Sequence, residues 1–117
     1  MERAKGSGTS VLMQFRLTAR DERDIEELAE LAGEGSRAEV VRQAVLRDWS
    51  TEELAYGALW GGMGAGARDG GLWPIRFKRS EAQELKRRAR EAGMSYVGYL
   101  RACVLLAAKA YREGVGT

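Results

Sequence analysis

The sequence has no histidine, one cysteine and one proline among its 117 residues. Histidine is the commonest general base and metal ligand, so its absence argues against an enzyme, a metal site or a cofactor. Cys103 cannot form a disulfide within the chain, which favours a reducing compartment. The longest apolar stretch, residues 102–108, is far shorter than a membrane span, and no signal-peptide pattern opens the chain. We therefore expect a cytoplasmic binding protein that does not enter the membrane.

Charge is distributed unevenly along the chain. Residues 1–60 contain 8 Lys and Arg against 12 Asp and Glu, a net charge of −4, whereas residues 61–117 contain 11 against 5, a net charge of +6. A basic half could attract a polyanion, because neutralisation of phosphates by Lys and Arg drives nucleic-acid binding. A solvated helix face would give the same pattern, so charge alone does not decide between these interpretations.

The first half of the chain is typical of a strand followed by two helices. Residues 13–18 alternate between apolar and polar, which indicates a half-buried strand. Thr18 or Asp21 can cap the next helix, and Gly33 can end it. Ser36, with Glu39 three positions later, can cap a second helix.

The remaining segments of the first half are less regular. The apolar periodicity of the second helix runs on as far as Leu59. Residues 61–71 include six glycines and predict a flexible linker, and the polar residues 1–10 predict a flexible tail.

The second half of the chain repeats the first. Residues 72–78 alternate again, Ser80 with Gln83 predicts the start of a helix, and Ser95 predicts the start of the last helix. The two halves align at an offset of 60 and, after a one-residue contraction, at 59. The matched pairs include Leu17 with Phe77, Ile25 with Leu85, Ala29 with Ala89, Gly33 with Gly93, Ser36 with Ser95, and Ala44 with Cys103.

This duplication predicts the fold. One strand with two short helices has no partner for its strand and too little core to be stable alone. Two copies can pair their strands and close four helices over the apolar face. We predict a mainly α-helical domain with a two-stranded antiparallel β-ribbon, an intramolecular pseudo-dimer of a first unit (11–60) and a second unit (72–113).

The outer face of such a ribbon would be hydrophilic and free of acidic residues. A two-stranded ribbon fits the major groove of DNA, where Arg can bond to guanine and Gln to adenine. An ordinary solvated sheet face is the alternative. The residues predicted for this face are Gln14, Arg16, Thr18, Pro74, Arg76 and Lys78.

The repeated order of strand, helix and helix resembles the ribbon-helix-helix (MetJ/Arc/CopG) superfamily in a tandem single-chain form. In the first copy the resemblance rests on residues 13–18 (MQFRLT), Gly33 and residues 36–44 (SRAEVVRQA), which are similar to the second helix of CopG-like repressors and antitoxins. In the second copy, residues 92–95 (AGMS) and 99–101 (YLR) are similar to MobC/NikA-type mobilisation proteins. The resemblance covers residues 13–49 and 73–112.

The resemblance implies roles for individual residues. In this superfamily alternate strand residues contact bases, and the start of the second helix docks on phosphate through backbone N–H groups. Pro74 offers no hydrogen-bond donor, which predicts asymmetric readout, and capping could occupy the hydroxyl of Thr18. The implied base contacts are Gln14, Arg16, Thr18, Arg76 and Lys78, and the implied phosphate contacts are Ser36, Arg37, Ser95 and Tyr96.

Three functions remain open at this point. The first is a sequence-specific double-stranded DNA-binding protein acting as a transcriptional regulator or repressor. The second is an accessory protein of a conjugative or mobilisable element that assists a relaxase at a transfer origin. The third is an antitoxin-like or phage protein-interaction module that uses residues 48–59. The free protein is expected to be a monomer, and the resemblance implies that a second copy could bind an adjacent half-site on DNA.

Overall fold

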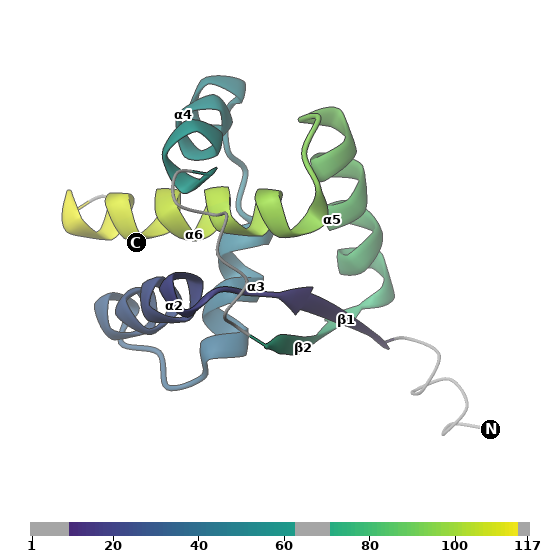
Figure 1. The fold of residues 1–117 in the computed structure, drawn as a ribbon, viewed down its shortest axis with the longest axis horizontal. Helices are drawn as coiled ribbons and strands as arrows, with labels where there is room; N and C mark the ends of the chain where they lie inside the picture. Colours follow the sequence, from purple (N-terminus) through teal and green to yellow (C-terminus); the bar gives the residue numbers. More distant parts are fainter. Residues whose placement is uncertain (1–9, 63–70, 115–117) are drawn as a thin grey trace.

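The computed structural model describes residues 10–62 and 71–114, and Figure 1 shows their arrangement. The prediction of a mainly helical chain with a two-stranded antiparallel ribbon is confirmed. The predicted tail is wrong at Ser10, which belongs to the first strand, and the predicted linker is wrong at Gly61 and Gly62, which end a helix. The rest of the tail (1–9) and residues 63–70 of the linker lie outside the described residues. The elements are β1 (Ser10–Arg16), α2 (Ala19–Ala32), α3 (Arg37–Leu46), α4 (Thr51–Gly62), β2 (Leu72–Lys78), α5 (Arg79–Glu91) and α6 (Tyr96–Arg112).

The ribbon pairs β1 with β2 in antiparallel register, with Gln14 opposite Pro74, next to the middle pair of Met13 and Ile75. Successive side chains of a strand point to opposite faces, so the alternation in the sequence buries one face of each strand. Phe15 and Phe77 lie on this inner face, and their rings meet edge to face at 6.5 Å between centroids. This geometry is one of the two that aromatic rings favour.

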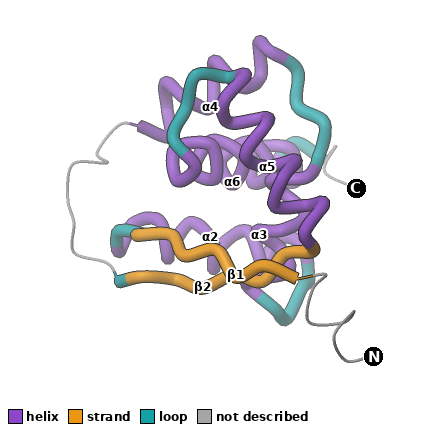
Figure 2. Tube along the Cα trace, turned by 90° about the vertical axis from the view of Figure 1, so that its right-hand side faces the viewer, coloured by secondary structure: helices purple, strands orange, loops and turns teal. Residues whose placement is uncertain are grey.

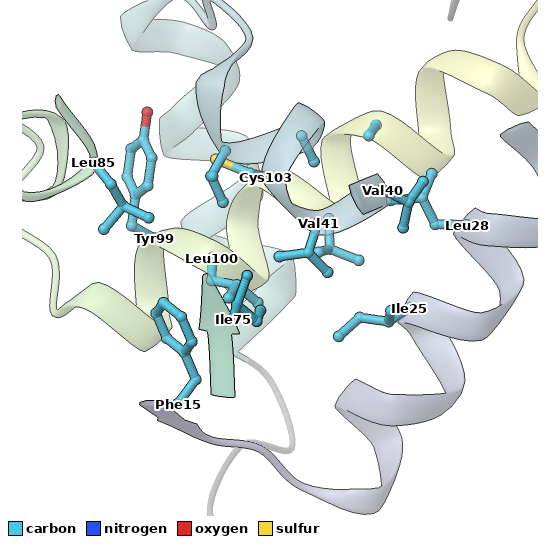
Figure 3. Packing of buried hydrophobic residues seen from close by; sticks show 14 of the residues in the cluster. Phe15, Ile25, Leu28, Val40, Val41, Ile75, Leu85, Tyr99, Leu100 and Cys103 are labelled. Carbon is cyan, nitrogen blue, oxygen red and sulfur yellow. The ribbon is translucent and has the colours of Figure 1, made fainter. Parts of the chain in front are cut away.

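The helices cover only the inner face of the ribbon. In Figure 2 the strands lie along one side of the molecule, with α2, α3, α5 and α6 on their inner side and α4 beyond α6. Ile25, Val41 and Leu100 fill the space between helices and ribbon (Figure 3).

Cys103 is fully buried in the same core, and burial raises the pKa of its thiol to about 12. The thiol is therefore protonated at neutral pH and serves as a packing residue.

Helix α4 is a separate element, so the predicted continuation of the second helix to Leu59 is wrong. A reciprocal cap explains the break: the Glu53 N–H donates to Ser50 Oγ at 3.0 Å, and the Ser50 N–H donates to the Glu53 carboxylate at 2.8 Å. The new helix packs closely on α6 at Gly57, where an added Cβ would come within 3.0 Å of the Cβ of Ala102. Small residues at both positions allow this close approach.

The first helix of each half, α2 and α5, begins in a different way. Thr18 caps α2 as predicted, because its hydroxyl accepts from the Asp21 N–H at 3.1 Å. Helix α5 follows β2 directly and begins at Arg79, so the predicted start at Ser80 with Gln83 is wrong. The carboxylate of Glu81 instead accepts from the backbone N–H of Lys78 at 2.9 Å.

Candidate nucleic-acid interface

The outer face of the ribbon consists of alternate, exposed residues from both strands. Four of the five predicted base-contacting residues are exposed there, and none of the strand residues is acidic. Arg16 and Arg76 lie on either side of the Gln14–Pro74 pair. The exposed residues are Leu12, Gln14 and Arg16 from β1, and Leu72, Pro74, Arg76 and Lys78 from β2.

The prediction that Thr18 lies on this face is wrong. β1 ends at Arg16, and Thr18 is only 5% exposed because it turns inward to cap α2. Two outer-face residues, Leu12 and Leu72, were missed by the sequence analysis. The signal was present, because the same two-residue period extended toward the start of each strand reaches both of them.

A cleft of about 330 Å³ lies between the start of α3 and one end of the ribbon. Ser36 lines it from α3, and its hydroxyl accepts from the backbone N–H of Glu39 at 3.1 Å. Arg76 and Lys78 line it from β2, and Arg42 lines it from α3. The structure thus places a predicted phosphate contact beside two predicted base contacts. Glu39 also lines the cleft and pairs with Arg42 at 2.7 Å, so Arg76, Lys78 and the helix N-terminus are the groups that favour an anion at this position.

Arg37 is held away from this cleft. Its guanidinium lies 5.0 Å from the centroid of the Trp73 ring and donates to Glu26 at 2.9 Å. Stacking on an aromatic face suits the planar guanidinium and positions it beside β2. The Arg37 side chain therefore contributes to packing between α3 and the ribbon, and only its backbone N–H stays at the start of the helix.

Ser95 and Tyr96 lie at the start of α6, where the Ser95 hydroxyl accepts from the Gly98 N–H at 3.0 Å. Tyr96 is 41% exposed. α3 begins at the level of the ribbon in Figures 1 and 2, whereas α6 begins above that level, near the far end of α5. The two predicted phosphate-binding helix starts are therefore placed differently relative to the ribbon.

Helix α5 carries a basic run of Lys86, Arg87, Arg88 and Arg90, and two of its arginines are paired with acidic residues. Arg87 pairs with Glu84 and, at 2.8 Å, with Glu91. Arg88 donates to Glu84 at 2.6 Å and to Asp48 at 3.0 Å. Hydrogen bonds from these two arginines lower the pKa of Glu84 to about 2. The charges of Arg87 and Arg88 are thus balanced by carboxylates rather than added to the ribbon face.

Two equivalent ion pairs connect the halves of the chain. Arg42 on α3 donates to Glu81 on α5 at 3.3 Å, and Arg101 on α6 donates to Asp21 on α2 at 2.9 Å. Each carboxylate also accepts the backbone N–H of the residue three positions before it. The arginine of each second helix thus holds the first turn of the first helix in the other half.

Replacing Arg101 with alanine should lower the free energy of unfolding by about 1–3 kcal/mol, measured by urea denaturation. The variant leaves the Asp21 carboxylate, whose side chain is only 10% exposed, without its cation. Arg112→Ala is the matched control, since its pair with Glu27 is about half exposed and should contribute little. Equal losses from both variants would show that the pair with Asp21 has no special role.

No protein-family model, curated protein or solved structure matches this chain. Across residues 10–62 and 71–114, no helix is long and apolar enough to cross a membrane. In the same part of the chain, His, Cys, Asp and Glu side chains form no group of three that could hold a metal ion.

Proposed function

We propose that this chain is a tandem ribbon-helix-helix protein that binds double-stranded DNA sequence-specifically and regulates transcription. The observation that carries the proposal is the outer face of the ribbon. Exposed Gln14, Arg16, Arg76 and Lys78 share that face without an acidic neighbour on either strand, in a chain with 17 acidic residues. Arg and Gln are the side chains that recognise guanine and adenine edges in the major groove.

Two features support a pseudo-two-fold arrangement of the halves. Gln14 and Pro74 occupy equivalent places in the repeats, and they lie opposite each other in the register. An axis through this pair would exchange Arg16 with Arg76. The Arg42–Glu81 and Arg101–Asp21 pairs are equivalent in the same way.

In this proposal the ribbon lies in the major groove with its outer face toward the base edges. Arg16 and Arg76 each donate two hydrogen bonds to a guanine, and Gln14 pairs with an adenine. Lys78 and the start of α3 at Ser36 hold a phosphate at the cleft, which fixes the orientation of the ribbon on the duplex. Pro74 offers no donor opposite Gln14, so the centre of the target is read from one side.

A protein-binding role is a second candidate, favoured by one observation. Tyr56, Leu59 and Trp60 are exposed on α4 at 42%, 64% and 47%. In Figures 1 and 2, α4 lies beyond α6 and away from the ribbon. A partner such as a relaxase could contact α4 while the ribbon holds DNA, which would suit an accessory protein at a transfer origin.

Selection of bound fragments from the DNA of the source organism tests the proposal. The full chain should enrich a small set of sequences, and footprinting should locate one protected site in each. Sites that overlap promoters support a transcriptional regulator, whereas sites beside a relaxase nick support the accessory role. If no sequence is enriched above bulk DNA, the outer face is not a reader of bases and the proposal fails.

A further inference from the structure

Two leucines project from the outer face of the ribbon into solvent. Leu12 is 48% exposed and Leu72 is 51% exposed. Isolated exposed leucines are ordinary on a protein surface, but these two occupy a face that is otherwise composed mainly of hydrogen-bonding side chains. A ligand that covered this whole face would therefore need apolar groups opposite the leucines and polar groups opposite the other side chains.

The two leucines are placed alike in the two strands. They are equivalent at the offset of 60 that relates the repeats, as Arg16 and Arg76 are. In the register Leu12 lies opposite Arg76, and Leu72 lies opposite Arg16. Each side of the Gln14–Pro74 pair thus presents one leucine beside one guanidinium.

The major groove contains a matching combination of groups. The C5 methyl of thymine is the apolar group displayed there, and guanine displays the two acceptors that an arginine can bind. We infer that Leu12 and Leu72 are specificity residues that contact thymine methyl groups, next to the guanines bound by Arg76 and Arg16. This inference rests on the proposed DNA binding. It predicts a target with thymine and guanine on both sides of an asymmetric centre.

Exchange of thymine for uracil tests the inference, because the exchange removes only the methyl group. The probe is a duplex selected by the full chain from a random pool, remade with deoxyuridine at one thymine of the protected site at a time. At one thymine on each side of the centre, the exchange should weaken binding by about fourfold, the factor expected for one buried methyl group. Exchanging both should weaken it by about 15-fold.

Leucine variants assign each methyl to its residue. Leu12→Ala should bind the thymine duplex more weakly and should no longer distinguish thymine from uracil on one side, and Leu72→Ala should do the same on the other side. Leu59→Ala is the matched control, because Leu59 is also exposed but lies on α4. This control should show the full uracil effect.

The possible failures are distinguishable. A selected duplex whose uracil copies bind as tightly as the original, or whose protected site lacks thymine, overturns the leucine inference and leaves DNA binding intact. The leucine inference is also overturned, with DNA binding intact, if Leu12→Ala and Leu72→Ala still bind the uracil duplexes as much more weakly than the thymine duplex as the unmodified chain does. If no duplex is selected at all, the proposed function fails and this inference fails with it.

Discussion

The Arg16→Ala/Arg76→Ala double variant should bind a selected duplex at least about 30-fold more weakly than the unmodified chain. Each arginine, as a bidentate partner of guanine, should contribute about 1–3 kcal/mol to specific binding. Both side chains are exposed on the ribbon and lie on opposite sides of its centre. Their removal should therefore leave the fold unchanged, and the loss of affinity can be measured by fluorescence anisotropy at fixed salt concentration.

Matched variants separate base recognition from charge. Arg90→Ala/Arg112→Ala removes the same two charges from α5 and α6, away from the ribbon, and should change affinity little. Arg16→Lys/Arg76→Lys keeps the charges but loses the planar fork, so it should discriminate the selected from a scrambled duplex less well than the unmodified chain, by the share of specificity that the arginines supply. If the alanine variant on the ribbon and the one on the helices lose the same affinity, the arginines act only through charge and the proposed readout is wrong.

Phe77→Ala should lower the free energy of unfolding by about 3–5 kcal/mol, the range for removal of a buried aromatic side chain. Phe77 has no exposed surface, and its ring packs edge to face on Phe15 across the ribbon. The variant would leave a cavity where the inner face of the ribbon meets the helices. A loss of this size is a large part of the 5–15 kcal/mol that stabilises a typical domain.

Urea denaturation followed by circular dichroism measures this loss. Phe77→Leu keeps most of the volume and should cost less than the alanine variant. Trp60→Ala is the control for loss of an exposed aromatic, since Trp60 is 47% exposed on α4, and it should change stability by less than about 1 kcal/mol. A cost for Phe77→Ala no greater than that for Trp60→Ala would mean that the ribbon does not need its inner face for stability.

The ribbon could be predicted because burial of one face produces a two-residue period that is visible in the sequence. Phe15 and Phe77 stand at positions of this period and are buried as expected. Thr18 continues the same pattern, but its hydroxyl is also suited to capping a helix, and capping prevails because the strand ends at Arg16. Local hydrogen bonding thus overrides periodicity at the end of an element. Leu12 lies on the outer face for a separate reason, because it stands two residues before Gln14 in the same strand.

The break before α4 and the ion pairs between the halves could not be predicted, because they depend on side-chain interactions that the spacing of apolar residues does not show. The break before α4 follows from the reciprocal cap of Ser50 and Glu53, although apolar residues continue on both sides of it. Arg42 and Glu81 are 39 positions apart in the sequence, and Arg101 and Asp21 are 80 positions apart, yet each two form an ion pair. Partners at such separations are brought together by the packing of helices from different halves. The sequence alone shows only that charged residues are present at these positions.

Because β1 and β2 belong to one chain, the ribbon forms without an encounter between two molecules. Its integrity should therefore be the same at nanomolar as at micromolar protein, whereas a ribbon shared by two chains dissociates on dilution. For a DNA-binding protein, occupancy of a single site would then rise with the first power of protein concentration. The ribbon would also stay paired when only a few copies of the protein are present in a cell. The two strands also carry different residues at equivalent positions, as Gln14 and Pro74 show, and under the proposed function this difference would let one chain match a target whose halves differ.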